Sequence, residues 1–117
     1  MKKIIAFLFL SVLVLWFASE VLAATKWYEG GTLQAATREE WINATYANRL
    51  ASSAQFVAEG FVGGKIVKEK GWDALKPRSV RFEKHMMDIL SGSKYKNIDV
   101  SEAAIMCENV LILEDMK

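Results

Sequence analysis

The chain has 117 residues, a mass of 13.2 kDa and a formal net charge of +1. Its length allows one domain, and a hydrophobic content of 52% with so small a net charge excludes an intrinsically disordered protein. A single cysteine excludes an intramolecular disulfide framework and a four-cysteine zinc site.

The N-terminal segment predicts a secretory signal peptide over residues 1–23. Lys2 and Lys3 give it a positive start, and an apolar run follows over residues 4–18. Ala23 has the small side chain that signal peptidase requires before its cut, so we expect cleavage after Ala23 and a periplasmic or secreted protein. The alternative is an uncleaved membrane anchor, for which the run is short, because a spanning helix needs about 20 residues.

The predicted mature domain, residues 24–117, begins with an irregular leader over residues 24–36 that is rich in aromatic residues and glycine. Trp27, Tyr28 and Leu33 are its candidate binding residues, because aromatic side chains beside glycines form adaptable contact sites. The alternative is that Trp27 and Leu33 anchor the leader to the helices.

A first helix is predicted over about residues 37–63. Thr37 and Glu40 have the spacing of a capping box at its start, and Gly63-Gly64 is expected to end it. Apolar residues at spacings of three and four form one stripe, namely Ile42, Tyr46, Leu50, Ala54, Val57 and Phe61. An edge of small residues beside the stripe would let another helix approach closely, namely Ala44, Ala47, Ala51 and Ala58.

Two further helices are predicted over about residues 77–91 and 99–114. Pro77 suits a first helical turn, and the residues ahead of it, Trp72–Leu75, are expected to form a short turn of helix. The apolar positions of the second helix are Val80, Phe82, Met86, Met87, Ile89 and Leu90. Those of the third are Val100, Ala103, Ala104, Met106, Cys107, Val110 and Leu111. The chain therefore predicts an all-α fold, a small three- to four-helix bundle.

The leader and the first helix share a pattern with known proteins. The pattern runs Trp27-Tyr28-x-Gly30-Gly31-Thr32-Leu33, then Ala36-Thr37, then Ala47-Asn48-Arg49-Leu50-Ala51-Ser52. It resembles a family of small exported bacterial proteins of unknown function, in which a WY-x-GGTL-x-x-AT leader precedes an Asn-(Lys/Arg)-Leu-Ala helix. The resemblance implies an exported, helical protein and no particular activity.

A second resemblance begins at Phe56. The order is Phe-x-x-Glu-Gly-Phe-x-x-Gly, the turn at Trp72–Leu75, a helix, a polar break and an alanine-rich helix. This order is similar to that of the periplasmic immunity proteins that neutralise type VI secreted amidase effectors. Those proteins usually carry paired cysteines, whereas this chain has only Cys107.

Opposite charges gather in two segments. Residues 65–84 have a net charge of +4, and residues 97–117 have a net charge of −4. In one interpretation the two patches neutralise each other within the bundle. In the other, a basic face docks an acidic partner or anionic lipid. The candidate binding residues of that face are Lys65, Lys68, Lys70, Arg78 and Arg81.

The sequence predicts no catalytic residue, cofactor or metal site. His85 is the only histidine, and although Asp88 lies one helical turn further on, a catalytic or metal site needs several groups that converge. Cys107 lies on the predicted inner face of the third helix. An intermolecular disulfide at Cys107 is the alternative, because an odd cysteine in an oxidising compartment can pair between chains.

These observations predict an exported non-enzymatic helical protein that binds a macromolecular partner in the cell envelope, such as an immunity-like inhibitor. Nucleic acid is not expected as a partner, and the membrane is expected only for an uncleaved signal anchor. A homodimer, through the alanine edge or Cys107, is a further prediction. The alternative function is a periplasmic stress or acid-response chaperone, which would release apolar surface when carboxylates are protonated.

Overall fold

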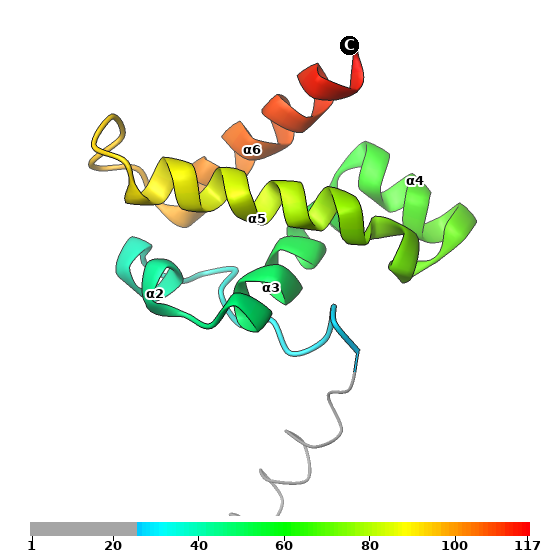
Figure 1. Ribbon diagram of the computed structural model, residues 1–117, viewed down its shortest axis with the longest axis horizontal. Helices are drawn as coiled ribbons and strands as arrows, with labels where there is room; N and C mark the ends of the chain where they lie inside the picture. The colour runs from blue at the N-terminus through cyan, green and yellow to red at the C-terminus, as the bar shows by residue number, and fades with distance from the viewer. Residues whose placement is uncertain (1–25) are drawn as a thin grey trace, which may run out of the picture.

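The computed structural model describes residues 26–117, whose regular structure is entirely helical (Figure 1). The elements are α2 (Arg38–Asn43), α3 (Tyr46–Glu59), α4 (Phe61–Lys70), the 3₁₀ turn η1 (Trp72–Leu75), α5 (Lys76–Ser91) and α6 (Val100–Asp115). The predicted all-α fold is confirmed. The predicted signal peptide and its cleavage site lie outside the described residues.

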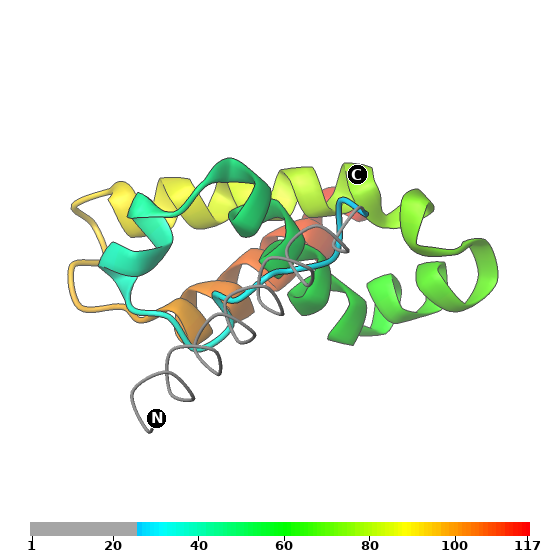
Figure 2. The ribbon, with the colours of Figure 1, turned by 90° about the horizontal axis from the view of Figure 1, so that it is seen from below.

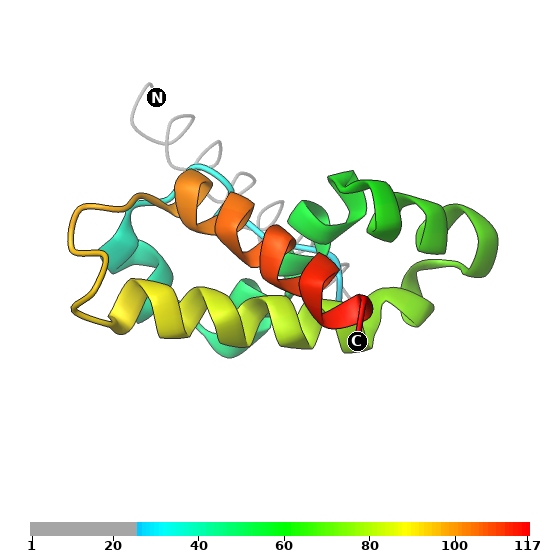
Figure 3. The same ribbon diagram turned by 90° about the horizontal axis from the view of Figure 1, so that it is seen from above.

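The central element of the bundle is α5, against which α3 and α6 both pack (Figures 1 and 3). The C-terminal end of α6 lies over the N-terminal part of α5 (Figure 3). The core contains Leu33, Trp41, Val57, Leu75, Phe82, Met86, Leu90, Val100, Ala103, Ala104, Cys107 and Leu111. Burial of this apolar surface is the main favourable term in folding.

The predicted first helix is wrong in its extent, because two breaks divide it. At Ala44 the backbone is extended, with ψ of 163°, and the Thr45 hydroxyl then caps α3 by accepting a hydrogen bond from the Asn48 N–H. At Gly60 the backbone is extended again, with ψ of 160°, and α4 begins. The predicted stripe therefore does not stay on one face, and Tyr46 and Phe61 are exposed.

Gly63 and Gly64 do not end a helix but lie inside α4. A Cβ on Gly63 would lie 1.9 Å from the carbonyl oxygen of Val57, so this close approach of α4 to α3 requires glycine. The helix ends instead at Gly71, whose φ of 89° favours glycine.

The second and third predicted helices are confirmed to within one residue at each end. The Thr37 capping box is present in both directions, and Asp99 accepts a hydrogen bond of 2.8 Å from the Glu102 N–H. The predicted turn at Trp72–Leu75 is η1, with Leu75 fully buried. Val80, one of the apolar positions of the second helix, is 38% exposed, and Ser79 beside it is buried.

The leader lies along α3 (Figure 2) and covers part of the small-residue edge that was predicted to receive another helix. The Thr32 N–H donates to Asn48 Oδ1 at 2.9 Å, and the Leu33 N–H donates to Ser52 Oγ at 3.0 Å. A Cβ on Gly31 would lie 2.5 Å from the backbone nitrogen of Ser52, so the leader can approach α3 this closely only at a glycine.

Candidate partner-binding surface

The leader residues that were predicted to bind a partner make internal contacts. Leu33 is buried in the core, where it anchors the leader to the helices. Trp27 is half-buried, and its Nε1 donates to Asp73 Oδ1 at 3.0 Å. The Tyr28 ring stacks on that of Trp72, with 4.7 Å between the centroids. These contacts fasten the start of the leader to the turn before α5.

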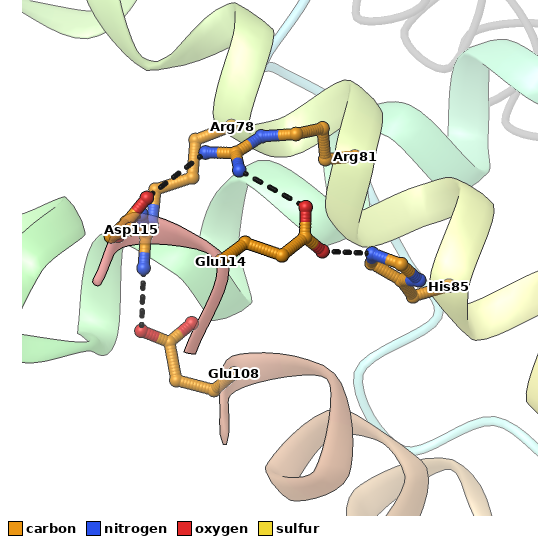
Figure 4. A network of polar contacts seen from close by, with 6 residues as sticks. All are labelled: Arg78, Arg81, His85, Glu108, Glu114 and Asp115. Atoms are coloured by element: carbon orange, nitrogen blue, oxygen red, sulfur yellow. Dashed lines mark hydrogen bonds and ion pairs between the residues drawn. The ribbon is translucent and has the colours of Figure 1, made fainter. Parts of the chain in front are cut away.

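The predicted basic face is divided in the structure. Lys65, Lys68 and Lys70 are exposed on α4. Arg78 is only 4% exposed and forms ion pairs with Asp115 and, at 3.6 Å, with Glu108 (Figure 4). Arg78 therefore does not belong to an exposed basic surface, and its charge is neutralised by the acidic α6.

The same network includes two more side chains of α5 (Figure 4). Arg81 pairs with Glu114 at 3.4 Å and with Asp115 at 3.5 Å. His85 Nε2 lies 2.6 Å from Glu114 Oε1, so the partner of the histidine comes from α6 and not from Asp88. This network clamps the end of α6 onto α5.

The clamp changes the acidity of its carboxyl groups. The hydrogen bond with His85 holds the pKa of Glu114 below its ordinary value, and the charge of Arg81 adds to this. The hydrogen bond from Arg78 likewise lowers the pKa of Asp115. Both carboxylates are therefore bound more tightly in their ionised form than in their protonated form.

Cys107 is fully buried against the core. Burial raises the pKa of its thiol to about 12, and the nearby charges of Asp88 and Glu108 contribute. A disulfide to a second chain would need α6 to leave the core, so the described packing is incompatible with that prediction. Within residues 26–117, no group of three histidine, cysteine or acidic side chains has an arrangement that could hold a metal ion.

The outer face of α6 is a surface that the sequence did not predict. Its large apolar side chains are exposed opposite the buried face, namely Ile105 (65%), Ile112 (39%), Leu113 (62%) and Met116 (78%). We call these four residues the α6 outer face. Ile105 and Ile112 are seven residues apart, so they lie on the same side of the helix. A helix that is apolar on both sides is typical of a buried helix, and here one side is uncovered.

A groove of about 330 Å³ adjoins the α6 outer face. It lies between α3 and α6, both of which rest on α5. Its apolar lining includes Phe56, Phe82 and Ile105, and Glu59 and Glu108 lie at its two sides. Because Ile105 belongs to both features, the groove and the α6 outer face form one continuous surface. Phe61, which follows the groove residue Gly60, is 89% exposed.

Comparison of the chain with protein-family models, curated proteins and solved structures gave no match. The two resemblances therefore stay predictions. Among the residues from Lys26 onward, no helix combines the length and apolar character that a membrane crossing requires.

Proposed function

We propose that this chain is an exported, non-enzymatic helical protein that binds a macromolecular partner in the cell envelope, as an immunity-like inhibitor does. The α6 outer face is the observation that carries the proposal. Exposed apolar surface forgoes about 25 cal/mol for each Å² left in water, and a domain of this size has little stability in reserve. Several exposed apolar side chains on one side of such a domain are typical of a protein-interaction site.

Two further observations support this function. The charged side chains of α5 and α6 pair with one another, which accounts for them without a catalytic role. The predicted signal peptide over residues 1–23 supports export.

The proposal is tested by cross-linking in envelope extract. A tag joined after Lys117 through a Gly/Ser linker recovers the chain together with whatever is attached to it. We expect one protein partner in stoichiometric amount, with loss of that partner in the Ile112→Asp variant and retention in Tyr46→Asp. Tyr46 is a suitable control because it is also an exposed apolar residue but lies at the opposite end of α3 from the groove. Recovery of the chain alone would contradict the proposal.

A second function, an acid-response chaperone, is favoured by the clamp between α5 and α6. Protonation of Glu114 and Asp115 would remove the charges that hold the end of α6, and its buried face would then become available to clients. The test is binding of an apolar dye at about pH 3 with helical circular dichroism retained. Equal dye fluorescence at pH 3 and at pH 7 would exclude this function.

A further inference from the structure

We infer that the α6 outer face and the adjoining groove bind a basic amphipathic helix of the partner protein. This inference rests on the proposed function and adds the chemistry of the partner to it.

The shape of the surface suits a helix. Ile105 and Ile112 of α6 and Met116, its C-cap, form a row, and the eleven steps from Ile105 to Met116 span about 17 Å at 1.5 Å per residue. A partner helix of about three turns covers that length with apolar residues at spacings of three, four and seven. The groove beside Ile105, with Phe56 and Phe82 in its lining, offers room for one bulky apolar side chain of the partner.

The charge around the surface is acidic. The helix α6 carries no lysine or arginine between Val100 and Asp115, and three of its four carboxylates pair with side chains of α5, which leaves Glu102. Glu102, one turn before Ile105, and Glu59, at the α3 side of the groove, are both exposed. Neither has an ion-pair partner among residues 26–117. A partner that supplies lysine or arginine beside its apolar face therefore complements this surface.

The same charges argue against a second copy of the chain as the occupant. Pairing two of these surfaces would bring together Glu59 and Glu102 of both chains, none of which has an ion-pair partner among residues 26–117, and like-charge juxtaposition at an interface is destabilising. Arg78 and Arg81 of α5, which contact the end of α6, are already engaged within the same chain. A symmetric pairing of these faces thus lacks the positive charge that it would need.

The probe for this inference is a synthetic helical peptide of leucine and lysine, about 14 residues long so that it covers the α6 row, with one apolar and one basic face. The chain is expressed with its own N-terminal segment, and any purification tag is removed. Fluorescence anisotropy of the labelled peptide then reports binding. We expect binding that weakens as ionic strength rises, because part of the attraction is between exposed charges.

Matched variants locate the site. The pair Ile105→Asp with Ile112→Asp is expected to weaken binding by at least about tenfold, which corresponds to 1.4 kcal/mol, whereas Tyr46→Asp leaves it unchanged. The pair Glu59→Gln with Glu102→Gln is expected to weaken binding and flatten its salt dependence. Glu69→Gln is the charge control, because Glu69 is equally exposed but lies on α4. Since all four altered residues of the two pairs are exposed or at the rim, circular dichroism should remain that of the unaltered chain.

Three results would overturn the inference. The first is equal binding of a peptide with glutamate in place of lysine, which would show that the surface does not select a basic partner. The second is unchanged binding by the Ile105 and Ile112 variant, which would show that the peptide binds elsewhere than on the α6 outer face. The third is sedimentation of the chain as a dimer that the same variant dissociates, which makes a second copy the occupant. If cross-linking still recovers a partner, the proposed function stands and only the basic-helix inference fails.

Discussion

At the scale of single residues, contacts between the leader and α3 explain the spacing between the two parts of the sequence pattern, residues 27–37 and 47–52. Gly31, Thr32 and Leu33 meet Asn48 and Ser52 of α3, so the two halves of the pattern are two sides of one contact. Both halves are visible in the sequence, whereas their contact joins residues that are far apart along the chain and has no local signal.

Two neighbouring serines test this contact. Ser52 Oγ accepts the buried N–H of Leu33, whereas Ser53 Oγ is buried without a hydrogen-bond partner in the described chain. We expect Ser52→Ala to destabilise the fold by about 1–3 kcal/mol, because it leaves a buried donor unsatisfied. Ser53→Ala should be neutral or stabilising. Urea unfolding measures the change in the free energy of unfolding for both variants. Equal changes would show that the hydrogen bond from the Leu33 N–H to Ser52 Oγ does not stabilise the fold.

The thiol of Cys107 gives a second residue-scale prediction. Because burial raises its pKa to about 12, the thiolate is scarce near pH 8, and a thiol reagent should label the folded chain only when α6 opens. The expected rate is far below that of the same chain in urea. Labelling of the folded chain as fast as the unfolded chain would place the thiol at the surface and restore the intermolecular disulfide as an alternative.

At the scale of elements, local signals predicted α5 and α6 well and the first helix poorly. Pro77 and Asp99 act through their own neighbours along the chain, so their helices begin where the sequence indicates. At the break, Gly60 lies against α6, where a Cβ would be 2.7 Å from Glu108 Oε1. The spacing of apolar residues by three and four along the chain carries no information about that contact.

The glycine pair inside α4 tests this account. Gly63→Ala is expected to destabilise the fold by about 2 kcal/mol or more, because backbone of α3 blocks the added methyl group. At Gly64 the nearest obstacle is the Ala58 carbonyl oxygen at 3.0 Å. There alanine's gain in helix propensity of about 1 kcal/mol offsets part of the crowding. Thermal unfolding compares the two variants, and a larger loss for Gly64→Ala would mean that α4 packs differently on α3.

The clamp between α5 and α6 was half predicted from sequence. The opposite net charges of the two segments indicated that they neutralise each other, and Arg78 and Arg81 do so. The particular pairs, such as His85 with Glu114, depend on the crossing of the helices, which no local signal specifies.

At the scale of the whole molecule, this clamp links stability to pH. The folded pKa values of Glu114 and Asp115 are lowered, so their contribution is present at neutral pH. It is lost as the pH falls below the ordinary carboxyl values of about 4 towards the folded pKa values. We expect the double variant Glu114→Gln, Asp115→Asn to be less stable at pH 7 and to lose less stability on acidification. Urea unfolding over a pH series measures this, and an unchanged acid dependence would mean that other carboxylates dominate.

The α6 outer face is the feature of the whole molecule that sequence analysis did not find. Apolar residues in a helix were assigned to the core, and the inner positions alone accounted for the expected bundle. Only the packing of α6 on α5 shows that Ile105, Leu113 and Met116 are left exposed. The distinction between core and surface lies in the tertiary arrangement, since the residue types are the same on both sides.

We propose above all that the α6 outer face contacts a partner protein. Its most direct measurement is photo-cross-linking in living cells, with a photoreactive amino acid at position 112 and, as the control, at position 46. We expect one cross-linked species of defined mass from position 112 and none from position 46. Absence of a species from position 112, or the same species from both positions, would contradict it.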